Sequence, residues 1–186
     1  MRGIVITAVL LALPAAPAVG AELAGVTLPD TVRVGDATLV LNGLGLREAT
    51  FLKVDVYVAG LYLPEKTGDA DRILDGEGPR RLQMSFVRDV KRADLVKGFA
   101  EGFEKNSPEA MPALRARLDR LDGFLVDVAR GDTLIFTWEP GRGVRVEIQG
   151  RERGMIEGAD FGRALLAVWI GPRPPNAGLK AGLLGR

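Results

Sequence analysis

The spacing of apolar residues changes along this chain of 186 residues, and the order of the changes limits the folds open to it. Residues 26–87 hold short apolar runs rich in β-branched side chains, which are typical of strands. Apolar residues then recur every three or four positions over 95–125, as on helices packed against a core. Strand-like runs return at 133–156, and a last helical pattern covers 161–169. This segregation predicts an α+β domain with a large, mainly antiparallel sheet covered by a layer of helices.

The longest strand-like run is Phe51–Leu63. Its even positions are apolar through the first half, whereas its odd positions are mixed, as in a strand with one buried face. Because this run is long for a single strand, we expect a bend, at Gly60. Upstream of it, Asn42-Gly43 predicts a turn.

Local signals mark where the helices and a hairpin begin. Asp89 stands where an N-cap residue would precede the first large helix. Ser107-Pro108 predicts a second helix start, with a capping hydroxyl before a proline at the first helical position. Pro140–Gly143 lies between two strand-like runs and predicts a β-hairpin.

The chain has no cysteine and no histidine. It therefore has no disulfide, no Ser-His-Asp or Cys-His catalytic group and none of the usual zinc ligand sets, so we expect no metal site. Of its 25 basic residues one, Arg2, lies in the first 21 residues, which leaves 24 basic and 24 acidic residues in the remainder. A remainder with no net charge and no basic cluster gives no reason to expect a nucleic-acid partner.

The N-terminus carries the pattern of a cleavable secretory signal. Arg2 precedes the apolar run Ile4–Leu13, and Val19-Gly20-Ala21 places small residues at the −3 and −1 positions before Glu22. The apolar run is too short to span a bilayer, which takes about 20 residues. We therefore predict a signal peptide over 1–21 and one domain over 22–186, a periplasmic location, and no transmembrane segment after cleavage.

Four segments, in this order over nearly the whole predicted mature chain, resemble the chalcone isomerase superfamily, and specifically its bacterial exported chalcone-isomerase-like members. They are a glycine-rich segment ending in arginine, a long strand ending in Gly-x-Tyr-Leu, a Phe-x-Arg-Asp junction before a large helix, and a last long helix: residues 41–47, 53–63, 86–90 and 156–171.

The resemblance implies an open-faced β-sandwich, in which helices cover one face of a large antiparallel sheet and a ligand cleft opens at one end. Plant enzymes of this family close a chalcone ring to a flavanone without a cofactor. Non-catalytic relatives in plastids bind fatty acids. The resemblance therefore implies that this chain needs no cofactor.

Of five functional positions in the family's enzymes, one keeps its residue type here. The catalytic arginine matches Arg47. The strand threonine falls on Tyr57 and the threonine of the last helix on Val168, while the helical tyrosine and asparagine fall near Asp94 and Glu101. The polar network that would position a substrate is thus largely replaced.

Two of the polar side chains, Arg47 and Tyr57, allow more than one interpretation. Arg47 is either an exposed turn residue or a cation in the cleft that holds a carboxylate or stabilises an enolate, and we favour the cleft. Tyr57 is either half-buried packing or a hydroxyl donor to the same anion. Tyr62 has the opposite strand parity and is predicted to be structural.

Two functional hypotheses follow. The leading one is non-catalytic binding of a small hydrophobic ligand, a fatty acid or a similar hydrophobic carboxylate, with Arg47, Tyr57 and Val168 as binding residues. The alternative is a cofactor-independent isomerase, an intramolecular lyase acting on a chalcone-like phenolic or enone, with Arg47 as its catalytic residue. The loss of most of the enzymatic polar set favours binding over catalysis.

Overall fold

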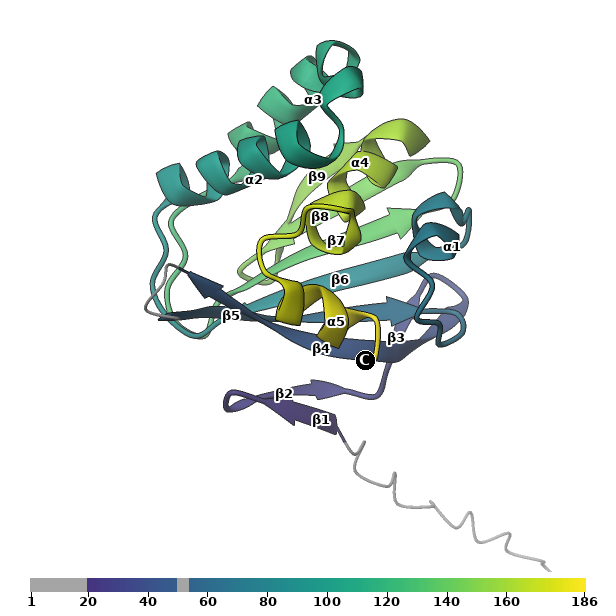
Figure 1. Ribbon diagram of the computed structural model, residues 1–186, viewed down its shortest axis with the longest axis vertical. Coiled ribbons are helices and arrows are strands. Elements are labelled where there is room, and N and C mark those ends of the chain that lie inside the picture. Colours follow the sequence, from purple (N-terminus) through teal and green to yellow (C-terminus); the bar gives the residue numbers. More distant parts are fainter. Residues whose placement is uncertain (1–19, 50–53) are drawn as a thin grey trace, which may run out of the picture.

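The computed structural model describes residues 20–49 and 54–186, and its centre is one antiparallel sheet of seven strands (Figure 1). Each strand pairs with the strands before and after it in sequence, so the sheet is a continuous meander. This confirms the predicted α+β class with a large antiparallel sheet. The strands are β3 (Thr31–Val34), β4 (Ala37–Ala49), β5 (Val54–Leu63), β6 (Arg80–Phe86), β7 (Thr133–Glu139), β8 (Gly143–Ile148) and β9 (Arg151–Ile156).

Helices cover one face of this sheet, as predicted (Figure 1). The most buried is α4, whose side chains after Ala159 are nearly all enclosed between the sheet and the outer helices. The main core lies between this helical layer and the sheet. No helix of 20–49 or 54–186 is long and apolar enough to cross a membrane. The helices are α1 (Ala70–Asp75), α2 (Arg92–Asn106), the 3-10 turn η1 (Pro108–Ala110), α3 (Met111–Phe124), α4 (Ala159–Ile170) and α5 (Ala177–Leu183).

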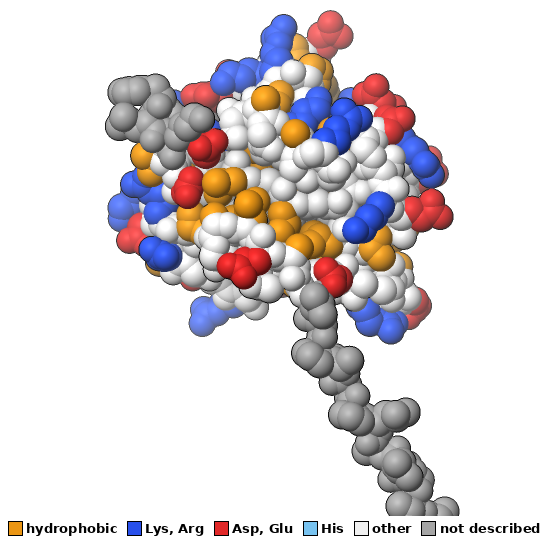
Figure 2. All heavy atoms as spheres, turned by 60° about the horizontal axis from the view of Figure 1, so that its bottom comes forward, with side chains coloured by type: hydrophobic (Ala, Val, Ile, Leu, Met, Phe, Trp, Pro, Cys, Tyr) orange, Lys and Arg blue, Asp and Glu red, His pale blue; other side chains and the backbone are white. Residues whose placement is uncertain are grey.

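The opposite face of the sheet packs against a separate two-stranded hairpin, β1 (Gly20–Leu23) and β2 (Val26–Pro29). The Tyr62 hydroxyl donates to the carbonyl of Pro29 at 3.0 Å, and the Leu28 side chain lies over Gly60. Figure 2 shows hydrophobic side chains gathered in a band on the face that looks downward in Figure 1. Tyr62 thus belongs to the second core on this side of the sheet, which agrees with its predicted structural role.

The predicted turn at Asn42-Gly43 is wrong, because β4 runs through both residues to Ala49. The physical reason is the packing of α5 on this strand. A Cβ at Gly43 would meet the carbonyl oxygen of Gly182, and a Cβ at Gly45 would meet that of Leu179. The glycines are therefore needed for close approach of a helix and not for a turn.

Two other boundary predictions are corrected. The helix expected after Asp89 begins at Arg92, and the Asp89 carboxylate instead accepts the backbone N–H of Arg130 at 2.9 Å. Pro108 opens a 3-10 turn without a side-chain cap, and α3 follows it. In the long strand, positions 51–53 lie outside the described residues. Gly60 stays within β5, paired with Leu44, and the ladder has two irregularities elsewhere, between the pairs of Leu41 and Gly43 and between those of Arg47 and Glu48.

Candidate functional site

Three neighbouring strands place one residue each in a row across the inner face of the sheet. Arg47 of β4 pairs directly with Tyr57 of β5, and Tyr57 pairs with Phe86 of β6. Directly paired residues in an antiparallel sheet present their side chains on the same face. The row therefore changes from a cation, through a phenol, to a purely apolar ring over two strand spacings.

This row forms part of the wall of a cavity of about 280 Å³. The sheet supplies one wall, α2 and the end of α4 supply the others, and the segment after α4 forms the rim. Aromatic rings close the inner end. Tyr57 and Phe86 meet edge to face with ring centres 5.7 Å apart, and Phe99 and Trp169 do so at 5.8 Å. Charged residues also line the cavity, on β4, on α2 and at the rim. An apolar inner end combined with a few polar groups is typical of small-molecule sites.

The Tyr57 hydroxyl is buried beside Trp169. Its oxygen accepts the indole N–H of Trp169 at 3.0 Å. Burial raises the pKa of Tyr57 to about 12, although the bond from Trp169 and the charge of Arg47 both lower it. Tyr57 is therefore a neutral phenol over the whole physiological range, and its own O–H remains a donor because the indole occupies an acceptor position.

Arg47 is the half-buried cation of the row. Its guanidinium donates to the carbonyl oxygen of Glu48. Among the residues that the structure describes, no carboxylate forms an ion pair with it, whereas Lys105 at the cavity edge is paired with Glu101 at 3.3 Å. A guanidinium stays charged at every relevant pH and presents forked donors that match a carboxylate. An anion entering this cavity would therefore meet Arg47 and the hydroxyl of Tyr57 together.

Two glycines on α2 shape the cavity wall. Gly102 packs against α4 so closely that a Cβ there would lie 2.6 Å from a methyl group of Val168. Gly98 lines the cavity, and a Cβ there would meet no atom within 4 Å. Glycine inside a helix lowers the stability of the helix by about 1 kcal/mol relative to alanine. At Gly102 this loss accompanies close packing against α4, and at Gly98 it accompanies open space in the cavity wall.

A short segment after α4, residues 171–176, forms the rim and is called the proline strap below. Asn106 holds it, because its Oδ1 accepts the N–H of Arg173 at 2.9 Å and its Nδ2 donates to the carbonyl of the same residue at 3.0 Å. At the other end Asn176 donates to the carbonyl of Leu46 at 3.1 Å. The proline strap is thus fixed to α2 and to β4.

The structure places all five positions named from the sequence around this one cavity: Arg47, Tyr57, Val168, Asp94 and Glu101. Arg47 lies in a strand and not in a turn, and it lines the cavity as expected for a cleft residue. Asp94 and Glu101 stand on the outer part of α2, where Glu101 pairs with lysines. The five positions thus share one cavity, and their role in binding stays a prediction.

Sequence reasoning missed the roles of Trp169 and Phe86. The helical pattern over 161–169 predicts only that Trp169 lies on a packed helix, and it does not predict the hydrogen bond to Tyr57. The available signal was chemical: a buried indole N–H needs an acceptor. Phe86 is located by the strand register alone, which links it to Tyr57.

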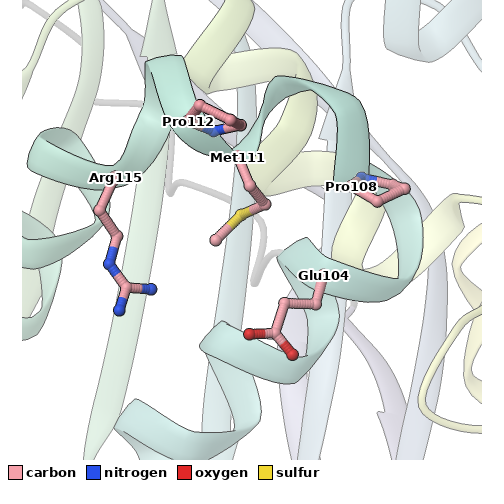
Figure 3. Close-up of a pocket in the computed structure, with 5 residues that line it drawn as sticks. All are labelled: Glu104, Pro108, Met111, Pro112 and Arg115. Atoms are coloured by element: carbon pink, nitrogen blue, oxygen red, sulfur yellow. The ribbon is translucent and has the colours of Figure 1, made fainter.

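A second hollow lies where α2 meets η1 and α3 (Figure 3). Met111 extends into the space between Glu104 and Arg115, and prolines lie on its edge. It is an open depression on the surface with no buried polar side chain among its lining residues. In the part of the chain that the structure describes, no three acidic residues come together as a metal site would require.

A meander sheet covered by helices, with a cavity between the sheet and α2, defines an open-faced β-sandwich with an internal cavity. The chain matches the family model described as chalcone isomerase-like over residues 20–185, and it belongs to that family. No curated protein matches its sequence. A crystal structure of a fatty-acid binding protein from Arabidopsis thaliana has the same fold, with a TM-score of 0.68 and 19% identity. That match covers 86% of this chain and 92% of the plant chain.

Proposed function

We propose that this protein binds a hydrophobic carboxylic acid, such as a fatty acid, and does not transform it. The observation that carries the proposal is the pairing of Arg47 with Tyr57 on the cavity wall, beside an inner end closed by aromatic rings. The fatty-acid binding protein with the same fold supports the same class of ligand.

The carboxylate would accept hydrogen bonds from Arg47 and from the hydroxyl of Tyr57. Trp169 would keep that hydroxyl in place, because its indole N–H occupies one side of the Tyr57 oxygen. The hydrocarbon would lie toward Phe86 and Phe99, where its burial replaces water contacts. This orientation keeps the charged group at β4 and the apolar part over β5 and β6.

The test compares acid binding by delipidated protein with binding by paired variants. Arg47→Gln should weaken binding about 10- to 100-fold, since a hydrogen bond to a charged group contributes about 1.5–3 kcal/mol. Its control is Arg33→Gln, at an exposed arginine on β3. Tyr57→Phe should weaken binding a few-fold, and its control is Tyr62→Phe on the opposite face of the sheet.

Two outcomes would overturn the proposal. One is unchanged affinity in Arg47→Gln, which would remove the head-group role of the arginine. The other is turnover of a chalcone-like enone that disappears in Arg47→Gln, which would replace binding with catalysis. Isothermal titration calorimetry addresses the first outcome, and the loss of enone absorbance addresses the second.

We further propose that the protein is exported and acts in the periplasm. The support is the sequence pattern of the first 21 residues. Gly20 and Ala21 pair with Pro29 and Leu28 in the β1–β2 hairpin, so cleavage after Ala21 would remove half of β1. Small residues also stand at −3 and −1 for cleavage after position 18, which would leave the hairpin whole. Intact mass of the protein from an envelope fraction distinguishes the two sites, and an unprocessed mass would contradict export.

A further inference from the structure

We infer that the cavity selects carboxylic acids of medium length, about eight carbons, and gains nothing from longer chains. This inference rests on the proposed function and concerns the same site. It is carried by three independent observations: the cavity's volume, the length of the row Arg47–Tyr57–Phe86, and the fixed position of the walls.

The volume limits how much of a ligand is enclosed. The cavity measures about 280 Å³. One small group in a liquid occupies about 30 Å³, the share of a water molecule, so the cavity encloses about nine non-hydrogen atoms. A carboxylate, with three of these atoms, and about six further carbons fill that space, which is a chain of about seven carbons.

The row gives a somewhat longer limit, about ten carbons, so the two limits bracket a chain of about eight. Arg47 and Phe86 are two strand spacings apart, which is about 10 Å. An extended chain advances about 1.1 Å per bond, as a strand advances about 3.3 Å for each three-bond residue. A carboxylate held at Arg47 therefore brings a chain of about nine bonds to the level of Phe86.

The walls around this space cannot easily retreat. Val168 is in contact with Gly102 across the α2–α4 interface, and Phe99 and Trp169 pack edge to face behind them. The proline strap is tied to α2 through Asn106. A longer hydrocarbon would therefore find no further space at the inner end, which the aromatic rings close, and would add no buried surface.

The test measures dissociation constants for saturated acids of increasing length. Affinity should rise about fourfold for each added methylene while the chain is being buried, and then level off near eight carbons. Val168→Ala removes two methyl groups from the wall, and it should move the plateau to about ten carbons. Native mass spectrometry of each loaded protein confirms that one acid is bound.

The matched control is Val144→Ala, at a fully buried valine on β8 that does not line the cavity. Circular dichroism confirms that both variants are folded. A wild-type affinity that keeps rising to the longest acid would overturn the length limit while leaving the proposed function intact. The same plateau in Val168→Ala and Val144→Ala would also overturn it. Failure of every acid to bind would overturn the proposed function, and the length limit with it.

Discussion

Raising the pH should unfold this protein through its two tyrosines, the only ones in the chain. Burial raises the pKa of Tyr57 to about 12 and that of Tyr62 to about 12. In an unfolded chain both phenols titrate near 10. The folded state therefore retains two protons that the unfolded state loses between pH 10 and pH 12.

The sign and size of the effect follow from this difference. Each pKa unit corresponds to about 1.4 kcal/mol, so the raised pKa of Tyr57 contributes roughly 3 kcal/mol to the free energy of unfolding. This contribution is complete below pH 10 and is lost as the pH rises through about 12. It is a large share of the roughly 5–15 kcal/mol that stabilises a typical domain.

The assay combines urea unfolding at several alkaline pH values with tyrosinate absorbance. Tyrosinate should appear together with the loss of folded structure and not before it. In Tyr57→Phe the free energy of unfolding should fall less steeply above pH 10, and lysine titration cancels in the comparison with wild type. Ionisation of both tyrosines near pH 10 in folded protein would refute the burial of Tyr57 and Tyr62, and so the polar end of the proposed site.

Three further outcomes are expected. Gly43→Ala should lower the unfolding free energy by about 1–3 kcal/mol in chemical denaturation, because the new methyl group overlaps the backbone of α5, and no loss would mean that α5 packs elsewhere. Trp169→Phe should weaken acid binding a few-fold in wild type but not in a Tyr57→Phe background; equal losses in both would exclude positioning through the hydroxyl. Gly98→Leu should block acid binding in calorimetry, whereas Gly123→Leu on α3, also in open space, should not.

The sequence predicted the fold well because the spacing of apolar residues and the order of the elements do not depend on contacts between a few atoms. The strand runs, the hairpin around Pro140–Gly143 and the helical stripes all reappear as elements, since each depends on burying one face. What failed were signals that depend on a few atoms. Asn42-Gly43 has the composition of a turn, and only contact with α5, about 140 positions further along the chain, shows why the strand continues.

The site shows the same division. Arg47, Tyr57 and Val168 were located by motif, and the structure places all three on one cavity. The polar contacts of these residues could not be predicted from the sequence. They depend on the cross-strand register and on Trp169, which follows Val168 in sequence but donates a hydrogen bond to a residue 112 positions away. A helical stripe indicates burial and does not say which buried residue needs a polar partner.

The glycine-rich segment that ends in Arg47 now has one physical explanation. Gly43, Gly45 and Arg47 face the helical side of β4, opposite Leu61, Ala59 and Tyr57. The first two positions have no side chain because α5 lies directly on them. Arg47 is the next inward position along the strand, where the cavity begins. The packing of α5 therefore separates the helix-covered end of β4 from the end that lines the cavity, and it leaves Arg47 as the inward side chain of this segment on the cavity wall.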